Sequence, residues 1–251
     1  LTYSGNLANL DAVITAPGFK FVEADICDRA TMDEVFHKGG IQVVVNFAAE
    51  SHVDRSIHGP MEFIETNVVG TFQLLEAARA YFETLSSTEQ NTFRFLHVST
   101  DEVYGSLEPR EPAFLETRQY EPNSPYSASK AASDHLVRAW HHTYGLPVLT
   151  TNCSNNYGPF HFPEKLIPLF VTNLLEGKKI PVYGNGKNIR DWLFVGDHVD
   201  GIEKVIHKGI RGNVYNFGGD NELTNIDLVK HILDLLNIDY KKIKFYSFLH
   251  C

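Results

Sequence analysis

Three features are scarce in this sequence of 251 residues: cysteine, long hydrophobic runs and clusters of basic charge. Cys27, Cys153 and Cys251 are an odd number of cysteines, and we interpret all three as unpaired thiols. No hydrophobic run is long enough to span a bilayer, and no signal-peptide pattern opens the chain. These absences argue against a disulfide-stabilised secreted fold and a membrane anchor, and they favour the reducing cytosol.

Basic residues are outnumbered, with 22 Lys and Arg against 31 Asp and Glu and a net charge of −9. Nucleic acid and anionic membranes are therefore not expected partners, and any phosphate in a ligand must be bound by a few local groups. The twelve histidines show no His-Glu-x-x-His spacing, and no Cys-x-x-Cys pair is present. We therefore expect no metal site.

The chain alternates hydrophobic runs typical of strands with stretches that have helical spacing. Strands are expected at Phe19–Ile26, Ile41–Ala49, Phe93–Val98 and Pro147–Ser154, and helices at Pro60–Phe82 and Pro163–Gly177. The run Ile41–Ala49 is almost continuously apolar, which indicates a strand in the centre of a sheet. This alternation predicts an α/β fold with a doubly wound, Rossmann-like, mainly parallel sheet.

The pattern of predicted secondary structure changes near Pro159, where short strands and glycine-containing turns replace the long elements. We therefore expect two parts. Residues 1–158 would form the larger Rossmann-like domain, and residues 159–251 a smaller α/β region that binds a substrate.

Residues with chemical potential follow the strand at Phe93–Val98. The strand leads into Ser99, Thr100, Asp101 and Glu102, at the sheet edge where open α/β folds place their chemistry. Further on, the spacing Tyr126-x-x-x-Lys130 puts both side chains on one face of a helix. A neighbouring ammonium favours the phenolate, so Tyr126 is a candidate general base.

Adjacent carboxyl groups oppose joint ionisation, so Asp101 and Glu102 are expected to share one proton. Neighbouring strand residues point to opposite faces, so both acids can reach one ligand only if the strand has already ended. Acidic residues at the N-terminus of a helix would give the same pattern for electrostatic reasons alone. Their spacing leaves both interpretations open, and the pair Tyr126 and Lys130 favours the catalytic one.

The sequence contains four motifs that belong together: Ser99-Thr100-Asp101-Glu102-Val103-Tyr104-Gly105, Tyr126-x-x-x-Lys130, Asn46-Phe47-Ala48-Ala49-Glu50-Ser51-His52-Val53-Asp54 and Asn152-Cys153-Ser154-Asn155-Asn156-Tyr157-Gly158-Pro159. Together they resemble the extended short-chain dehydrogenase/reductase superfamily, and within it they are most similar to the dTDP-glucose 4,6-dehydratase family. The resemblance covers residue 1 to about 237. Related epimerases carry other residues in place of Asp101 and Glu102.

Two expected segments of that family do not occur in the sequence. Members open with a strand, a Gly-x-x-Gly-x-x-Gly turn and an acidic residue, and they carry a later Arg-Pro-Gly-His-Asp-x-Arg-Tyr segment. We therefore expect the chain to be an internal piece, with the two halves of its sheet left unpaired where the first strand belongs. On the same ground, we expect it to bind NAD weakly or not at all.

The resemblance implies an NAD-dependent dehydration of dTDP-glucose to the 4-keto-6-deoxy sugar nucleotide. Tyr126 would take the proton of the carbon 4 hydroxyl, with Lys130 beside it and Thr100 bonded to the reacting hydroxyl. Glu102 would remove the carbon 5 proton and Asp101 would protonate the departing carbon 6 hydroxyl. Two alternatives stay open: a nucleotide-sugar 4-epimerase or decarboxylase, and a non-catalytic fragment.

The resemblance also implies binding residues, a homodimer and a pathway. The dimer would form through the helices 60–82 and 125–144, and the product would serve bacterial rhamnose-containing surface polysaccharide. Residues expected near NAD are Asp25, Ile26, Ala48, Ala49, Ser51, Thr66, Tyr126, Lys130 and Asn156. Residues expected to bind the sugar nucleotide are Ser51, Thr100, Asn155, Lys165, Leu166, Pro181, Tyr183, Arg190 and Asn225.

Overall fold

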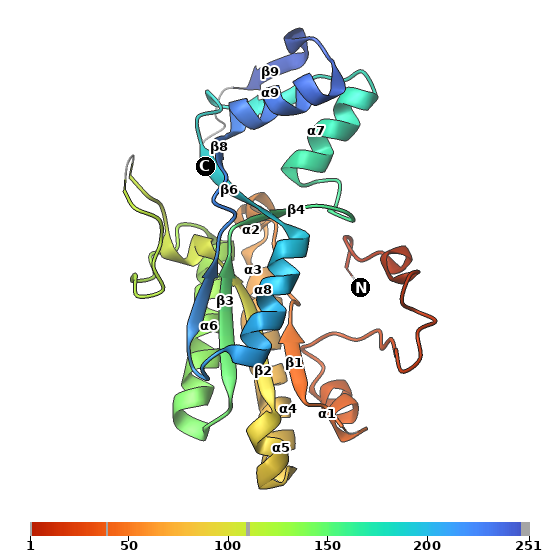
Figure 1. Cartoon of the computed structure of the whole chain (residues 1–251), viewed down its shortest axis with the longest axis vertical. Helices are drawn as coiled ribbons and strands as arrows, with labels where there is room; N and C mark the ends of the chain where they lie inside the picture. The colour runs from red at the N-terminus through yellow and green to blue at the C-terminus, as the bar shows by residue number, and fades with distance from the viewer. Residues whose placement is uncertain (1, 39, 109–110, 247–251) are drawn as a thin grey trace. The chain divides into compact units, whose positions relative to one another are not determined.

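The computed structural model describes residues 2–38, 40–108 and 111–246 (Figure 1). The chain forms two compact units, Leu1–Cys153 with Asp200–Phe217, and Ser154–Val199 with Gly218–Cys251. This division differs from the predicted one at residue 158, because the chain returns to the first unit after residue 199. Strand β7 (Val214–Phe217) pairs with β3 (Val148–Cys153) and so belongs to the first sheet.

The sheet of the first unit has the strand order β1-β2-β3-β7. Strands β1 (Val43–Asn46) and β2 (Arg94–Thr100) complete it, and all three pairings are parallel. In this register Asn46 lies beside His97 and Thr100 beside Cys153. The expected parallel α/β sheet is therefore present, and the carboxyl ends of its strands meet at one edge.

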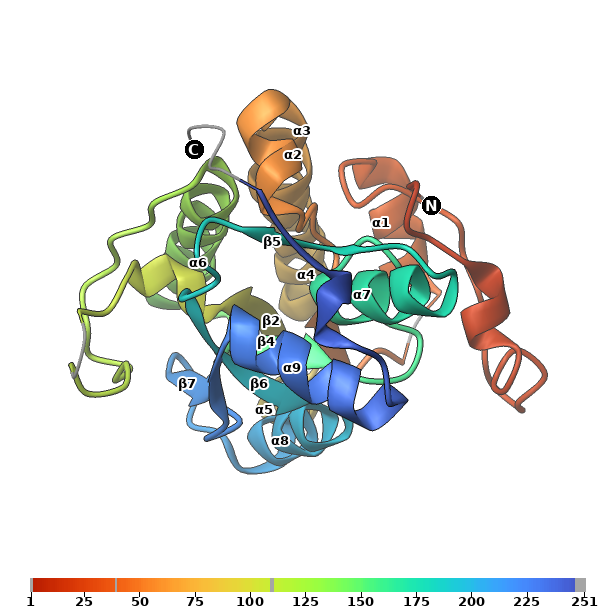
Figure 2. The ribbon, with the colours of Figure 1, turned by 90° about the horizontal axis from the view of Figure 1, so that it is seen from above.

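Helices cover both faces of this sheet (Figure 2). Apolar residues of α1 (Arg29–His37), α4 (Thr71–Thr84) and α6 (Pro125–Tyr144) pack with Phe95 and Val148 on one face. On the other face, Ile202 and Val205 of α8 (Val195–Lys208) pack on Leu96 and Leu149. Strands β2 and β3 are therefore buried on both sides, which explains their apolar runs.

The predicted helix Pro60–Phe82 is continuous but not regular. It consists of α3 (Pro60–Phe63), the π-helical segment η2 (Ile64–Gly70) and α4, and the short helix α2 (Val53–His58) precedes it. Pro60 stands in its first turn, as expected. The segment after it forms α5 (Ser87–Thr92), which Ser86 and Glu89 start with a capping box.

Three expectations about the N-terminal part and its sheet were wrong. Residues 19–25 have no regular structure, although a strand was predicted at Phe19–Ile26, and the preceding residues form only the 3-10 helix η1 (Leu7–Leu10). A strand needs a hydrogen-bonding neighbour, and none of the described strands lies beside this stretch. For the same reason β1 is an edge strand rather than a central one, and its Val43 is 38% exposed. The described strands of this unit form one continuous sheet, not two separated halves.

The second unit contains two small sheets. Strands β4 (Asn155–Tyr157), β6 (Ile189–Phe194) and β8 (Glu222–Thr224) form one, and β5 (Ile180–Tyr183) pairs with β9 (Ile243–Tyr246) in the other. Its helices are α7 (Leu166–Leu175), α9 (Asn225–Leu236) and the 3-10 helix η4 (Tyr240–Lys242). The apolar faces of α7 and α9 form its core with Ile180 and Trp192.

Candidate active site

The two adjacent acids stand at the end of β2, where the chain changes from strand to helix. The strand ends at Thr100, and the 3-10 helix η3 (Asp101–Tyr104) begins at the next residue. The Thr100 hydroxyl caps this helix by accepting the Glu102 N–H at 3.3 Å. Both acids are half-buried. The strand has therefore ended before the acids, which is the condition for both to reach one ligand.

Helix α6 carries the tyrosine and the lysine, and a capping box fixes its start. Ser124 and Ser127 exchange backbone and side-chain hydrogen bonds, with Pro125 in the first turn. Tyr126 is half-buried, whereas Lys130 is 3% exposed and donates to the Val98 carbonyl at 2.8 Å. The expected pair is thus one turn apart, and its lysine is tied to β2.

The electrostatics around Tyr126 show that the acids lie close to the phenol. Burial raises the pKa of Tyr126, the negative charge of Glu102 raises it further, and Thr100 opposes the rise by a hydrogen bond. Burial and the neighbouring acid therefore favour the neutral phenol, and the role of Tyr126 as a base stays a prediction. Burial also lowers the pKa of Lys130, and the charge of Asp134 counteracts that shift.

Asn67 connects this helix to the turn after β1. It is buried in η2, and its amide forms two hydrogen bonds with the main chain of Glu50 and one with Ser129 Oγ. Ser129 Oγ donates in turn to the Tyr126 carbonyl at 2.7 Å. Thr66, one residue before Asn67, is half-buried in the same segment.

Several residues expected near the cofactor lie around the turn after β1. Ala48 and Ala49 are half-buried with small side chains, and Ser51 is exposed. A lysine ammonium and a phenol are the donor and acceptor types that bind ribose hydroxyls, and alanines let a flat ring approach the backbone. The residues of this unit therefore fit the nicotinamide end of NAD.

The two residues expected near adenine have local partners. Asp25 is exposed, and its carboxylate accepts the Cys27 N–H at 2.8 Å, whereas the cap of α1 is Asp28. Ile26 packs beside Gly70, where an added Cβ would lie 2.6 Å from Ile26 Cδ1. Their approach to a nucleotide stays a prediction.

The residues expected around the sugar nucleotide come mainly from the second unit. Across the sheet β4-β6-β8, Asn155 pairs with Trp192 and Arg190 with Leu223, and the Asn225 N–H donates to the Asn188 carbonyl. The Asn225 Oδ1 is buried and finds no hydrogen-bond partner in the described part of the chain. Such an orphaned acceptor is suited to a ligand donor.

For the other residues expected to bind the sugar nucleotide, the structure gives the element but no contact that indicates a ligand. Lys165 and Leu166 stand at the start of α7, Pro181 lies in β5, and Arg190 is exposed. The Tyr183 side chain lies outside the described residues. Asn156, expected near the cofactor, bonds through Oδ1 to His198 Nδ1 at 2.9 Å within the second unit.

Two buried polar residues next to the site were missed by the sequence reasoning. His97 is fully buried in β2, and Asp134 lies one turn after Lys130 and accepts a hydrogen bond from Ser99 at 2.8 Å. A histidine inside an apolar strand, and an acid four residues after a lysine on the same helix face, are signals that could have found them.

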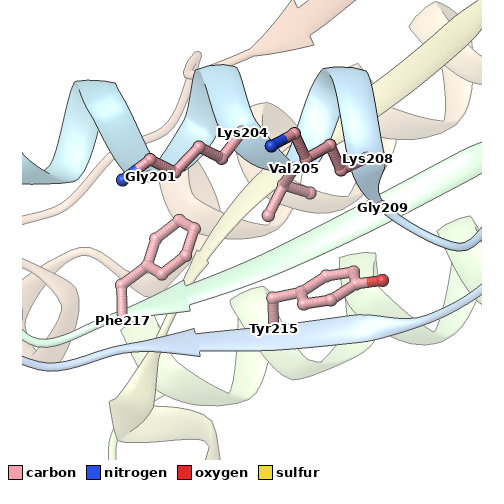
Figure 3. Close-up of a pocket in the computed structure, with 7 residues that line it drawn as sticks. All are labelled: Gly201, Lys204, Val205, Lys208, Gly209, Tyr215 and Phe217. Atoms are coloured by element: carbon pink, nitrogen blue, oxygen red, sulfur yellow. The ribbon is translucent and has the colours of Figure 1, made fainter.

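One shallow hollow lies apart from these groups, between α8 and β7 (Figure 3). Phe217 and Tyr215 point from the strand toward the helix, and an added Cβ at Gly201 would meet the Phe217 ring at 3.1 Å. No residue of the predicted site lines it. Within residues 2–38, 40–108 and 111–246, no three His, Cys, Asp or Glu side chains gather as metal ligands would. Across the same ranges, no helix has the length and hydrophobicity needed to cross a bilayer.

Comparison with known proteins agrees with this geometry. The profile of the family described as GDP-mannose 4,6 dehydratase matches residues 1–244. The dTDP-glucose 4,6-dehydratase of Neisseria meningitidis serogroup B is 58% identical over 236 residues, which are 94% of this chain and 66% of that protein. The chain thus spans about two thirds of the length of this curated relative.

Solved structures give the same result. The dTDP-glucose 4,6-dehydratase DesIV of Streptomyces venezuelae, crystallised with NAD and TYD bound, superposes with a TM-score of 0.91 at 48% identity, covering 98% of this chain and 73% of that one. The Bacillus anthracis enzyme in complex with NAD gives a TM-score of 0.89 at 47% identity, covering 100% and 74%. The sequence motifs, the fold and these relatives agree, and the chain belongs to the nucleotide-sugar 4,6-dehydratase family, among the dTDP-glucose 4,6-dehydratases.

Proposed function

We propose that this chain carries the catalytic groups of an NAD-dependent dTDP-glucose 4,6-dehydratase. The observation that supports it most directly is the grouping of Thr100, Asp101 and Glu102 around the Tyr126 phenol at the carboxyl end of β2. An epimerase on the same scaffold needs the tyrosine and lysine but has no use for two acids.

In this proposal Tyr126 takes the proton of the carbon 4 hydroxyl, and Thr100 orients that hydroxyl. Ala48, Ala49 and Lys130 would hold the nicotinamide end of NAD, which would supply the acceptor and donor of the hydride. Positive charge near a phenol favours its ionised form. The buried Lys130 ammonium, one helical turn after Tyr126, supplies that charge in this proposal. A ketone at carbon 4 makes the carbon 5 proton acidic, so oxidation must precede elimination.

The two acids divide the elimination between them. Glu102 removes the carbon 5 proton, and Asp101, carrying the shared proton, gives it to the hydroxyl that leaves carbon 6. Hydride return to carbon 6 completes a reaction without net oxidation. Residues of the second unit, chiefly Arg190 and Asn225, bind the nucleotide part of the substrate in this proposal.

The test replaces Glu102 with Gln and follows deuterium exchange from solvent into carbon 5 during turnover of dTDP-glucose. We expect exchange and product formation to fall by at least about a hundredfold, because a base in proton transfer contributes that much. Glu203→Gln, an exposed change on α8, serves as the control. Exchange at an undiminished rate in Glu102→Gln would contradict the proposed role.

The assay is run on the 251 residues and on the same residues within a chain of the relatives' full length, because this chain covers 66% of the Neisseria meningitidis protein. If the longer chain dehydrates dTDP-glucose and the shorter one does not, the assignment stands, and catalytic activity requires the further residues. If neither is active, the assignment fails.

We further propose that two copies pair through the helical stretches 60–82 and 125–144. Helices α4 and α6 pack side by side, and the Phe72 and Trp140 rings meet edge to face at 5.7 Å. Phe72 is 37% exposed and Tyr144 is 48% exposed, so an apolar strip faces outward. Phe72→Glu should convert a dimer to a monomer in analytical ultracentrifugation, whereas a chain that is monomeric without the change would rule this interface out.

A cytosolic location is also proposed. Neither Cys27 nor Cys153 forms a disulfide, as expected for a reducing compartment.

A further inference from the structure

A chain of hydrogen bonds crosses the interior of the first unit and ends at the turn of α6 that carries Lys130. Its centre is His97, which lies in β2 and is 0% exposed. Asn46 Nδ2 lies 3.2 Å from His97 Nδ1, and His97 Nε2 lies 3.2 Å from Ser133 Oγ. Ser133 Oγ donates to the Lys130 carbonyl at 2.8 Å. The end of β1 is thus linked to the lysine through two side chains.

The bonding partners fix the direction of each hydrogen bond. The Ala48 N–H donates to Asn46 Oδ1 at 3.1 Å, so the amide presents its NH₂ group to His97, whose Nδ1 must accept. A hydroxyl has one proton, and Ser133 gives its proton to the Lys130 carbonyl. Ser133 can therefore only accept from His97. This pattern of bonds requires a neutral imidazole with its proton on Nε2.

The charged surroundings agree with a neutral ring. Burial lowers the pKa of His97, and the charge of Lys130 lowers it further, while Asp134 opposes both. Both charged groups come from α6, and the side of β1 and α4 presents the uncharged Asn46 and Thr71. Asp134 is held by Ser99 and lies 3.4 Å from His97 Nε2.

Strand β2 therefore holds Lys130 at both ends. Its ammonium donates to the Val98 carbonyl, and its own carbonyl is fixed through Ser133 and His97. On the other side of His97, Asn46 fixes the N–H of Ala48, the first of the two small residues that fit a nicotinamide. One imidazole sets the position of both groups.

We propose that His97 is a positioning residue for the reaction. As a neutral imidazole protonated on Nε2, it locks the Lys130 turn of α6 to the Asn46–Ala49 segment, so that the ammonium and the cofactor-facing backbone keep one geometry. The catalytic consequence rests on the proposed function, whereas the tautomer and the lock do not. A purely structural histidine would stabilise the fold without affecting turnover.

The first experiment tests the lock without any assay of activity. The whole chain is labelled with ¹⁵N-histidine, and the His97 signals are assigned by their loss in His97→Gln. We expect the Nε2–H tautomer and a pKa below the ordinary 6.5 of histidine. A ring that titrates near its ordinary pKa, or one protonated on Nδ1, would overturn the proposal.

The second experiment separates positioning from stability by comparing four chains of the relatives' full length. His97→Leu removes both hydrogen bonds, His97→Gln keeps one donor and one acceptor, and Phe95→Leu weakens the core on the same strand face. We expect His97→Leu to lower kcat by about tenfold or more, with KM for the sugar nucleotide within about twofold of the unchanged chain. His97→Gln should recover most of kcat.

Phe95→Leu should lower the thermal midpoint and leave kcat within about twofold. Equal loss of kcat in Phe95→Leu and His97→Leu, or no loss in His97→Leu, would refute the positioning role. If His97→Leu does not fold, Ser133→Ala interrupts the same chain of bonds with a smaller change and must lower kcat. If the unchanged chain is inactive, the proposed function fails, and the ¹⁵N spectrum still decides the lock.

Discussion

The Asn67 side chain pairs with the main chain of Glu50 as two peptide groups pair in a sheet. Its Oδ1 accepts the Glu50 N–H at 2.8 Å, and its Nδ2 donates to the Glu50 carbonyl at 3.0 Å and to Ser129 Oγ at 2.8 Å. Asn67 is 1% exposed, so water cannot replace these bonds. The turn after β1, the helix with the π segment and α6 are thereby fixed to one another.

Replacing Asn67 with Ala should therefore destabilise the first unit. Both polar groups of Glu50 and the Ser129 hydroxyl lose a buried partner, and we expect the free energy of unfolding to fall by about 2–4 kcal/mol. Urea denaturation measures this loss. The exposed Asn123→Ala change is the control, and equal effects of the two variants would show that the pairing does not stabilise the fold.

Gly105 ends the short helix of the acids with a backbone that side chains tolerate poorly. Its φ is +87°, and an added Cβ would lie 2.5 Å from the Glu121 carbonyl oxygen. Gly145, with φ of +70° and nothing within 4 Å, offers a matched comparison. We expect Gly145→Ala to cost about 1–2 kcal/mol. Gly105→Ala should cost more, because its ψ of −135° places it outside the left-handed helical region of Gly145 and the added Cβ also meets the Glu121 carbonyl. Equal losses in thermal denaturation would contradict this.

Tyr104 links three elements through its hydroxyl. Asn152 Nδ2 donates to it at 2.9 Å, and it donates to Asn216 Oδ1 at 2.9 Å, so η3, β3 and β7 meet there. Tyr104→Phe leaves both amides short of a partner and should lower the free energy of unfolding by about 1–3 kcal/mol. The exposed Tyr144→Phe should change it by less than about 0.5 kcal/mol, and a neutral Tyr104→Phe would show that the amides find other partners.

The buried His97 gives stability a defined dependence on pH. Its pKa in the folded chain lies below the ordinary 6.5, so between the two values only the unfolded chain binds the proton. Stability must therefore fall as the pH drops below 6.5, by up to about 1.4 kcal/mol per pH unit from this residue.

His97→Gln cannot bind that proton, so its unfolding free energy should fall less between pH 7 and pH 5 than that of the unchanged chain. Urea denaturation at a series of pH values measures the difference. The exposed His207→Gln is the control and should follow the unchanged chain. Parallel curves for all three chains would mean that His97 titrates normally when folded.

The elements that could be predicted from the sequence are those whose local residue pattern follows directly from their place in the fold. Strands β2 and β3 lie between two helical layers, so nearly every residue must be apolar. The stretch Phe19–Ile26 has the same preference but no neighbouring strand among the described residues, and pairing is not visible in a local pattern. Helix α5 was predictable, because Ser86 and Glu89 have capping-box spacing.

The residues of the candidate site also fall into two groups, those that the sequence indicates and those that only the fold brings together. The sequence indicates the acids, Tyr126 and Lys130 as candidates because they are close in sequence or lie in recognisable motifs. The partners of His97 were not indicated, since Asn46 and Ser133 come from β1 and α6, distant in sequence, and only the fold brings them together. The rise in the pKa of Tyr126 also depends on burial, which no spacing reveals.

The wide turns of η2 decide which way Asn67 points. In an α-helix each residue advances by about 100° around the axis, and a π segment spreads its turns over more residues. Removing one residue between Ile64 and Asn67 would tighten the helix and rotate the remaining side chains relative to α4. The amide would then face away from Glu50, so the length of this segment is as constrained as its composition.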